Sequence, residues 1–198
     1  MFNHNRGLWG YSGTAADGEP LTIQSTGMGG PSAAIVISEL HDLGARTLLR
    51  VGTCGGLEPT LGLGELLIVS EAIAADGTSQ ALGGGARMAA SAPLLERLRA
   101  SAGPDARVGP IVTTDVFYDE RPGIERRWLA DGALAVEMEA ATLFALAARR
   151  GFAAGALLIV TDLILPKRRR IDAESLRGAE LRLGEVAAGA LAGGVASS

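Results

Sequence analysis

Apolar and polar positions along the chain follow two periodicities, one typical of strands and one typical of helices. Near-continuous apolar runs predict strands over residues 21–25, 47–51, 66–72, 108–113, 134–138 and 157–161. Apolar residues spaced three or four apart predict helices over residues 33–43, 93–102, 139–150 and 173–191. Strands that alternate with helices favour a mostly parallel sheet covered on both faces. The pattern therefore predicts an α/β fold: one three-layer α/β/α domain over residues 1–198, with a mixed, mostly parallel, twisted central sheet.

Composition and charge argue against several classes of protein, among them disordered, nucleic-acid-binding and membrane-spanning proteins. The chain has 198 residues, 20% of them charged, and a mean hydropathy of +0.25, which excludes intrinsic disorder as its main state. A net charge of −4 argues against binding nucleic acid through a general basic field. We expect no membrane span, because no apolar run approaches the roughly 18 residues that one needs. The single cysteine, Cys54, cannot form an internal disulfide, and the absence of a signal-peptide pattern agrees with a cytoplasmic protein.

Two features suggest an anion site at the ends of strands. Residues 27–30 form a glycine-rich turn whose N–H groups could point at a ligand, although a plain tight turn explains them equally well. Arg50 lies inside the apolar run LLRVGT, where a guanidinium must pair with an anion. That anion is either a ligand, helped by the N–H groups and hydroxyl of Gly52 and Thr53, or a structural Glu or Asp.

Acidic residues stand at two further strand ends. Glu137 and Glu139 flank Met138 at a strand-to-helix junction, where carboxylates also complement a helix dipole. Asp162 follows the last apolar run and is either a general acid or an ordinary cap or turn residue. Phe117 precedes Tyr118 in a loop and could stack on a flat ring or anchor that loop.

Other patterns predict little chemistry. The two histidines and one cysteine show no ligand spacing, so we expect no metal. The basic run at residues 167–170 is typical of a solvated loop or the rim of a lid.

Six segments together resemble the trimeric/hexameric nucleoside phosphorylase family, which includes bacterial and archaeal purine nucleoside and methylthioadenosine phosphorylases. They are NRGLWGYSG (5–13), STGMGGPSAAIVISEL (25–40), LLRVGTCGGL (48–57), TTDVFY (113–118), VEMEAATLFALA (136–147) and IVTD (159–162). The segments run in family order over nearly the whole chain, and VEMEAATL is the most specific of them.

The resemblance implies a role for each matching residue. The phosphate site would use Arg50, Thr53, Gly27 and, from a neighbouring subunit, Arg6. The ribose site would use Glu139, Met138 and Met28, and the base site would use Phe117, Thr114 and Glu137. Asp162 would be the catalytic acid and would donate a proton to purine N7.

The implied enzyme is a pentosyltransferase of purine salvage. It would cleave the N-glycosidic bond of a purine nucleoside, or of methylthioadenosine, with phosphate as co-substrate and no cofactor, to free base and ribose 1-phosphate. An acid role requires Asp162 to hold a proton near neutral pH, which partial burial and neighbouring anions would favour. The family also implies a homo-oligomer based on dimers, a trimer of dimers or a hexamer.

One departure from the family keeps alternatives open. Family members begin with a strand and a Gly-Asp-Pro-x-Arg phosphate loop, and no such sequence occurs in this chain. We therefore expect either an exposed sheet edge or a partner's strand in that place, and a loss of about 1.5–3 kcal/mol in phosphate binding. The alternatives are a nucleosidase, a uridine phosphorylase (disfavoured by Asp162) and a catalytically impaired homologue that binds nucleosides.

Overall fold

The computed structural model describes residues 1, 3–104 and 106–192. The strands are β1 (Gly10–Thr14), β2 (Pro20–Gln24), β3 (Thr47–Gly56), β4 (Leu66–Ala75), β5 (Arg87–Ala89), β6 (Arg107–Thr114), β7 (Ala135–Glu137), β8 (Ala153–Leu163) and β9 (Arg169–Arg170). The helices are α1 (Gly30–Asp42), α2 (Gly77–Ala81), α3 (Ala92–Ala102), α4 (Ile124–Ala130), α5 (Ala140–Arg150) and α6 (Ala173–Leu191), with a short 3-10 helix, η1, at Asn5–Gly7.

The central sheet is mixed and curls back on itself. Its strand order is β5-β4-β6-β7-β3-β8-β9, and the two longest pairings, β3 with β8 and β4 with β6, are parallel. An antiparallel pairing of β4 with β8 closes the strands between them into a ring. The predicted α/β class with a mixed central sheet is confirmed. The closure was not predicted, because a hydrophobic pattern reports which residues are buried and not which strands meet.

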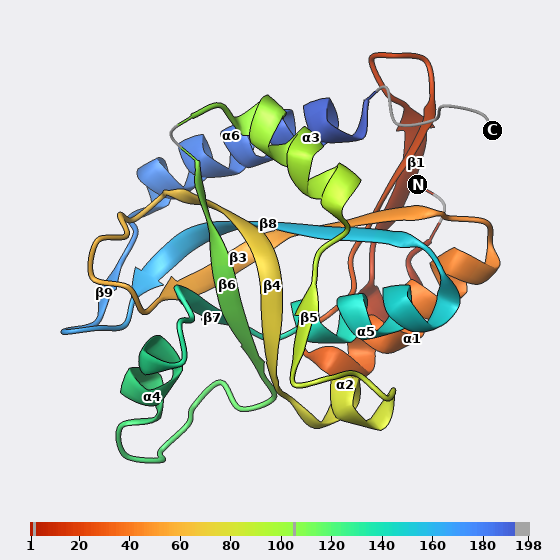
Figure 1. Cartoon of the computed structure of the whole chain (residues 1–198). Coiled ribbons are helices and arrows are strands. Elements are labelled where there is room, and N and C mark those ends of the chain that lie inside the picture. The colour runs from red at the N-terminus through yellow and green to blue at the C-terminus, as the bar shows by residue number, and fades with distance from the viewer. Residues whose placement is uncertain (2, 105, 193–198) are drawn as a thin grey trace.

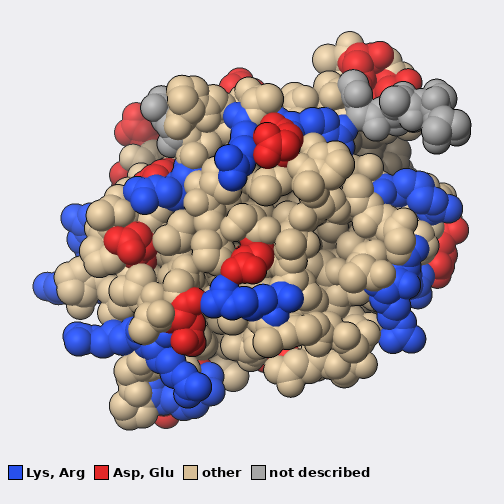
Figure 2. Space-filling view, in the orientation of Figure 1, with Lys and Arg blue, Asp and Glu red and all other residues tan. Residues whose placement is uncertain are grey.

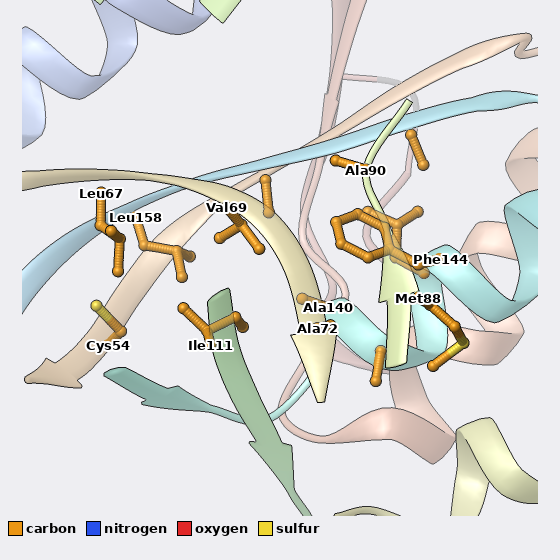
Figure 3. Packing of buried hydrophobic residues seen from close by; sticks show 14 of the residues in the cluster. Cys54, Leu67, Val69, Ala72, Met88, Ala90, Ile111, Ala140, Phe144 and Leu158 are labelled. Atoms are coloured by element: carbon orange, nitrogen blue, oxygen red, sulfur yellow. The ribbon is translucent and has the colours of Figure 1, made fainter. Parts of the chain in front are cut away.

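Helices cover the sheet on two sides (Figure 1), with α3 and α6 on one and α1 and α5 on the other. Phe144 of α5 anchors the larger core and lies beside Met88 of β5 (Figure 3). The α3–α6 side packs so closely that a side chain at Gly155 of β8 would meet Leu94 of α3 at 2.9 Å. Both faces of the sheet are therefore buried, as the near-continuous apolar strands predict.

The strands β1 and β2 form a separate antiparallel hairpin. In the central sheet, β3 pairs with β8 along one side and with β7 only at Gly55 and Gly56 on the other. Within the described ranges, the rest of that second side has no strand partner, and Val51 on it is 43% exposed. Within those described ranges, none of the helices is long and apolar enough to span a membrane.

Candidate active site

A compact cluster of one arginine and two glutamates forms where β3 meets β7 and α5. The guanidinium of Arg50 donates from Nε to Glu137 at 2.8 Å and contacts Glu139 through Nη2 at 2.6 Å. The three side chains are only 16%, 1% and 9% exposed. Arg50 lies back across Gly52, where a Cβ atom would come within 3.0 Å of Nη1. The structural ion pair that the sequence left open for Arg50 is therefore present, and it involves both glutamates.

Structural contacts hold both carboxylate oxygens of Glu137. Its Oε2 accepts hydrogen bonds from the backbone N–H groups of Glu139 and Ala140 as well as from Arg50, and its Oε1 accepts from the hydroxyl of Thr113. These bonds satisfy the first N–H groups of α5 and fix the direction of the guanidinium. Base binding by Glu137 stays a prediction, as does that by Thr114, whose hydroxyl accepts from the N–H of Val116.

Glu139 connects α5 to the glycine-rich turn before α1. Its Oε1 accepts the backbone N–H of Gly29 at 2.6 Å, and its Oε2 faces Arg50. Burial raises the pKa of Glu139, an effect that Arg50 opposes and that the charge of Glu137 reinforces. A carboxylate has about four lone-pair positions. Lone pairs therefore remain to accept hydroxyl groups of a sugar.

A buried polar cluster supports these elements from behind. Asp76 is 1% exposed, caps α2 through the N–H of Ser79 and accepts the hydroxyl of Thr142 in α5. Gly30, the first residue of α1, lies so close to Thr142 that a Cβ atom would meet its hydroxyl at 2.7 Å. Sequence reasoning missed Asp76 and Thr142, because Asp-Gly after a strand is typical of any turn and one threonine inside a helix gives no signal.

Asp162 lies in a second cluster at the end of β8. Its Oδ1 accepts from Nε of Arg170 at 2.8 Å and from Nε of Arg168 at 3.3 Å, and Thr161 donates to its Oδ2 at 3.2 Å. The charged side chains in contact with Asp162 are therefore the cations Arg168 and Arg170, whereas the sequence led us to expect anions nearby. Arg170 faces Asp162 because β9 folds back antiparallel onto β8.

The aromatic residues expected at the base site lie next to this second cluster. The guanidinium of Arg168 lies 6.0 Å from the centre of the Phe117 ring. Phe117 is 57% exposed and meets Tyr118 edge to face. The structure thus brings the expected acid and the expected stacking ring together, with Arg168 in contact with both.

Other expected site residues do not join either cluster. Arg6 lines a surface groove with Glu39 near the end of α1 and with Leu43 just after it, and Arg50 is not among the lining residues. Met28 is 87% exposed, Met138 is half-buried, and Thr53 is exposed on β3. Gly27 adopts a left-handed φ of 75°, and a side chain there would collide with Ser32. Phosphate or ribose binding by these residues stays a prediction.

Among the residues that the structure describes, no group of three or more His, Cys, Asp or Glu side chains could hold a metal ion.

Comparison of the sequence with known proteins identifies the family of this chain. A family model described as "Phosphorylase superfamily" matches residues 1–192. A guanosine phosphorylase of Halorubrum lacusprofundi is 40% identical over 163 residues, which are 80% of this chain and 68% of that protein. A DeoD-type purine nucleoside phosphorylase of Caldanaerobacter subterraneus is 38% identical over 81% of this chain and 72% of its own length. A protein of the same description from Alkaliphilus metalliredigens is 36% identical over 83% and 72%.

The chain belongs to the phosphorylase superfamily. The family resemblance inferred from the six segments is confirmed, and the relatives of known name are nucleoside phosphorylases.

Proposed function

We propose that the protein is a purine nucleoside phosphorylase, a pentosyltransferase that cleaves purine nucleosides with phosphate. Its relatives support this activity, since those named above are a guanosine phosphorylase and DeoD-type purine nucleoside phosphorylases. In the reaction, a phosphate oxygen forms a bond to C1′ of ribose while the C1′–N9 bond breaks. The bonding electrons leave with the base, which takes up a proton at N7. The products are the free purine and ribose 1-phosphate.

The observation that carries the proposal is the contact between Arg50 and Glu139 at 2.6 Å. A guanidinium suits a phosphate, and a carboxylate suits the vicinal hydroxyls of a ribose. Their direct contact would hold the nucleophile beside the sugar that it attacks, which replaces a bimolecular encounter by a positioned one. The N–H of Gly29 and the caps of Glu137 keep both groups in place before substrate arrives.

Asp162 is proposed as the acid that protonates the leaving base. Charge develops on the purine as the glycosidic bond breaks, so a proton or a cation near N7 stabilises the transition state. Phe117 would stack on the same base, since its exposed ring is linked to Asp162 through Arg168. The acid role requires that Asp162 take up a proton while the base is bound, with Arg168 released to the solvent or to the base.

One observation favours a second candidate, a nucleosidase that uses water in place of phosphate. Arg50 already faces two carboxylates, so the cluster carries a net charge of −1 when all three groups are ionised. A phosphate dianion would enter that cluster only with the help of a further cation. Without one, water would be the available nucleophile.

Product analysis separates the two candidates. The purified protein is incubated with guanosine, inosine, adenosine, methylthioadenosine and uridine, each with and without phosphate, and free base and ribose 1-phosphate are measured. The proposal expects purine release that requires phosphate and yields one ribose 1-phosphate per base. Release of base and free ribose without phosphate would identify the nucleosidase, and release from uridine alone would identify a uridine phosphorylase.

We further propose that Arg6 supplies the missing cation to a neighbouring subunit of a homo-oligomer. Three points support this: the family resemblance, the negative charge of the Arg50 cluster, and the position of Arg6 in a groove apart from Arg50. The lining of that groove includes Leu43, which is 77% exposed and would be covered by a neighbouring subunit in an assembly.

Subunit complementation tests this arrangement. Arg6→Ala and Asp162→Asn are each expected to be nearly inactive, whereas their co-expression should restore about a quarter of the wild-type sites, because half the dimers are mixed and each has one complete site. Co-expression of Asp162→Asn with Glu139→Gln is the matched control and should restore nothing if Asp162 and Glu139 serve the same site of one chain. No recovery in the first pair, with assembly intact, would reject the proposal for Arg6.

Location and physiological role complete the proposal. We propose a cytoplasmic enzyme of purine salvage, which is compatible with the buried free thiol of Cys54.

A further inference from the structure

We propose that Arg168 recognises the 6-oxo group of the purine, so that the enzyme prefers guanosine and inosine to adenosine. The inference rests on the proposed function, because it places the base between Phe117 and Asp162. It concerns a residue that the sequence pattern assigned to a solvated basic loop.

The geometry begins with the two contacts of Arg168. Its Nε lies 3.3 Å from Oδ1 of Asp162, and its Cζ lies 6.0 Å from the centre of the Phe117 ring. A base that stacks on Phe117 and reaches Asp162 through N7 must therefore lie against this guanidinium. Several basic side chains lie on the side of the molecule that carries β9 and α4 (Figure 2).

Arg168 and Arg170 differ in how firmly each is held. Arg170 lies in β9, directly across from Asp162 in the strand register, and its Nε is 2.8 Å from the carboxylate. Arg168 precedes β9 and makes the longer contact of 3.3 Å. When a base arrives, Arg170 can keep Asp162 in position while Arg168 exchanges its contact with the carboxylate for one with the base. Its side chain is 48% exposed, so this change buries no unpaired charge.

The chemistry of the guanidinium sets the preference. Arginine has only donors and no acceptor. Guanine and hypoxanthine present two adjacent acceptors, O6 and N7, on the edge that faces away from the sugar, whereas adenine presents a donor at the 6-position. With Asp162 at N7, an arginine at O6 would bind a 6-oxopurine and would face the amino group of adenine donor to donor.

The experiment compares substrates and variants in one cycle. kcat/KM is measured with inosine and with purine riboside, which lacks the 6-oxo group, for the wild-type enzyme, Arg168→Gln and Arg169→Gln. Arg169 is the matched control, since it is the neighbouring arginine of β9, pairs with Leu163 in the strand register and makes neither of the contacts with Asp162 described above for Arg168 and Arg170. Guanosine and adenosine are measured in parallel.

The wild-type enzyme should prefer inosine to purine riboside, and guanosine to adenosine, by about 10- to 100-fold, the discrimination typical of one good arginine contact to a base edge. Arg168→Gln should reduce both ratios to near one by lowering kcat/KM for the 6-oxopurine nucleosides, and Arg169→Gln should keep the wild-type ratios. Equal use of inosine and purine riboside by the wild-type enzyme, or unchanged ratios in Arg168→Gln, would overturn the inference.

Direct binding of free bases separates this inference from the proposed function. Calorimetry with guanine, hypoxanthine and adenine reports recognition even where no nucleoside is cleaved. A preference for 6-oxopurines that Arg168→Gln abolishes, together with no phosphate-dependent cleavage, would retain Arg168 as the base-reading residue and reject the phosphorylase. Phosphate-dependent cleavage without any preference at the 6-position would support the phosphorylase and reject Arg168 as the base-reading residue.

Discussion

Replacing Arg50 by methionine tests the central cluster most severely. Methionine is similar in length and apolar, so it occupies much of the same space but leaves Glu137 and Glu139 without their shared cation. Glu137 would keep three hydrogen bonds, from Thr113 and from two backbone N–H groups of α5. Glu139 would keep the hydrogen bond from the N–H of Gly29 but would lose its contact with the guanidinium.

The size of the effect follows from burial. Removal of one partner from a buried ion pair costs about 3–5 kcal/mol, because the remaining charge is left unpaired. The side chain of Arg50 is 16% exposed, so water can reach part of the cluster. We therefore expect the variant to lose about 3 kcal/mol of unfolding free energy at neutral pH.

The pH dependence has a defined sign. Burial raises the pKa of Glu139 in the folded protein, so its contribution to stability is present below the unfolded pKa and is lost as pH rises through the folded one. Arg50 opposes this rise, and Arg50→Met removes that opposition. Each further pKa unit by which the pKa of Glu139 rises would make the variant about 1.4 kcal/mol less stable at alkaline pH. The destabilisation should therefore be larger at pH 8 than at pH 5.

Urea unfolding at both pH values, at one fixed protein concentration, measures these differences. The control is Arg107→Met, which removes a more exposed pair with Glu65, 3.4 Å long and 38% and 24% exposed, and should cost less than about 1 kcal/mol. In the same samples, Arg50→Met should raise the KM for phosphate sharply. A loss below about 1 kcal/mol for Arg50→Met, equal at pH 5 and pH 8, would refute the reasoning that the cluster is a buried, tightly paired unit.

Three further predictions concern other parts of the molecule. Asp162→Asn should lower kcat for purine nucleosides by about 100- to 10,000-fold in steady-state assays, and an unchanged rate would remove it as the acid. Gly155→Ala should lower the unfolding free energy by about 1–3 kcal/mol in urea titrations, because its methyl group would meet Leu94; a neutral result would mean that α3 shifts freely. Burial raises the pKa of the Cys54 thiol, so iodoacetamide at pH 8 should label it only in urea, and fast labelling of the folded protein would contradict its burial.

Much of the fold could be predicted from the hydrophobic pattern alone. The helical spacing of Ala33, Val36 and Ile37 corresponds to the buried face of α1, and the apolar run at 157–161 lies inside β8. The hairpin of β1 and β2 was only half predicted. The residues of β1 after Gly10 are exposed and carry no alternation of the kind that marks a half-buried strand.

Pairings between distant segments could not be predicted. Strand β9 has only two residues, Arg169 and Arg170, both exposed, and in the sequence they are indistinguishable from a solvated basic loop. Their pairing with β8 brings Arg170 to Asp162, which reverses the charge expected around that carboxylate. Long-range contacts of this kind depend on which distant segments of the chain pair with each other. A local hydrophobic pattern does not determine that pairing.

The sequence predicted most of the residues of the candidate site, but it did not predict which of them contact one another. Arg50, Glu137 and Glu139 stood out because charges interrupt apolar strands there, and the structure joins all three. The sequence left a ligand and a structural glutamate as alternatives for Arg50. The structure shows the glutamates, and the phosphate remains a proposal.

The phosphate dependence of guanosine cleavage tests the central claim most directly. Guanosine is incubated with the purified protein while phosphate is varied, and guanine and ribose 1-phosphate are quantified together. We expect guanine release that saturates with phosphate and matches ribose 1-phosphate one to one. Guanine release at an equal rate without phosphate, or no release at any phosphate concentration from a folded, assembled protein, would contradict it.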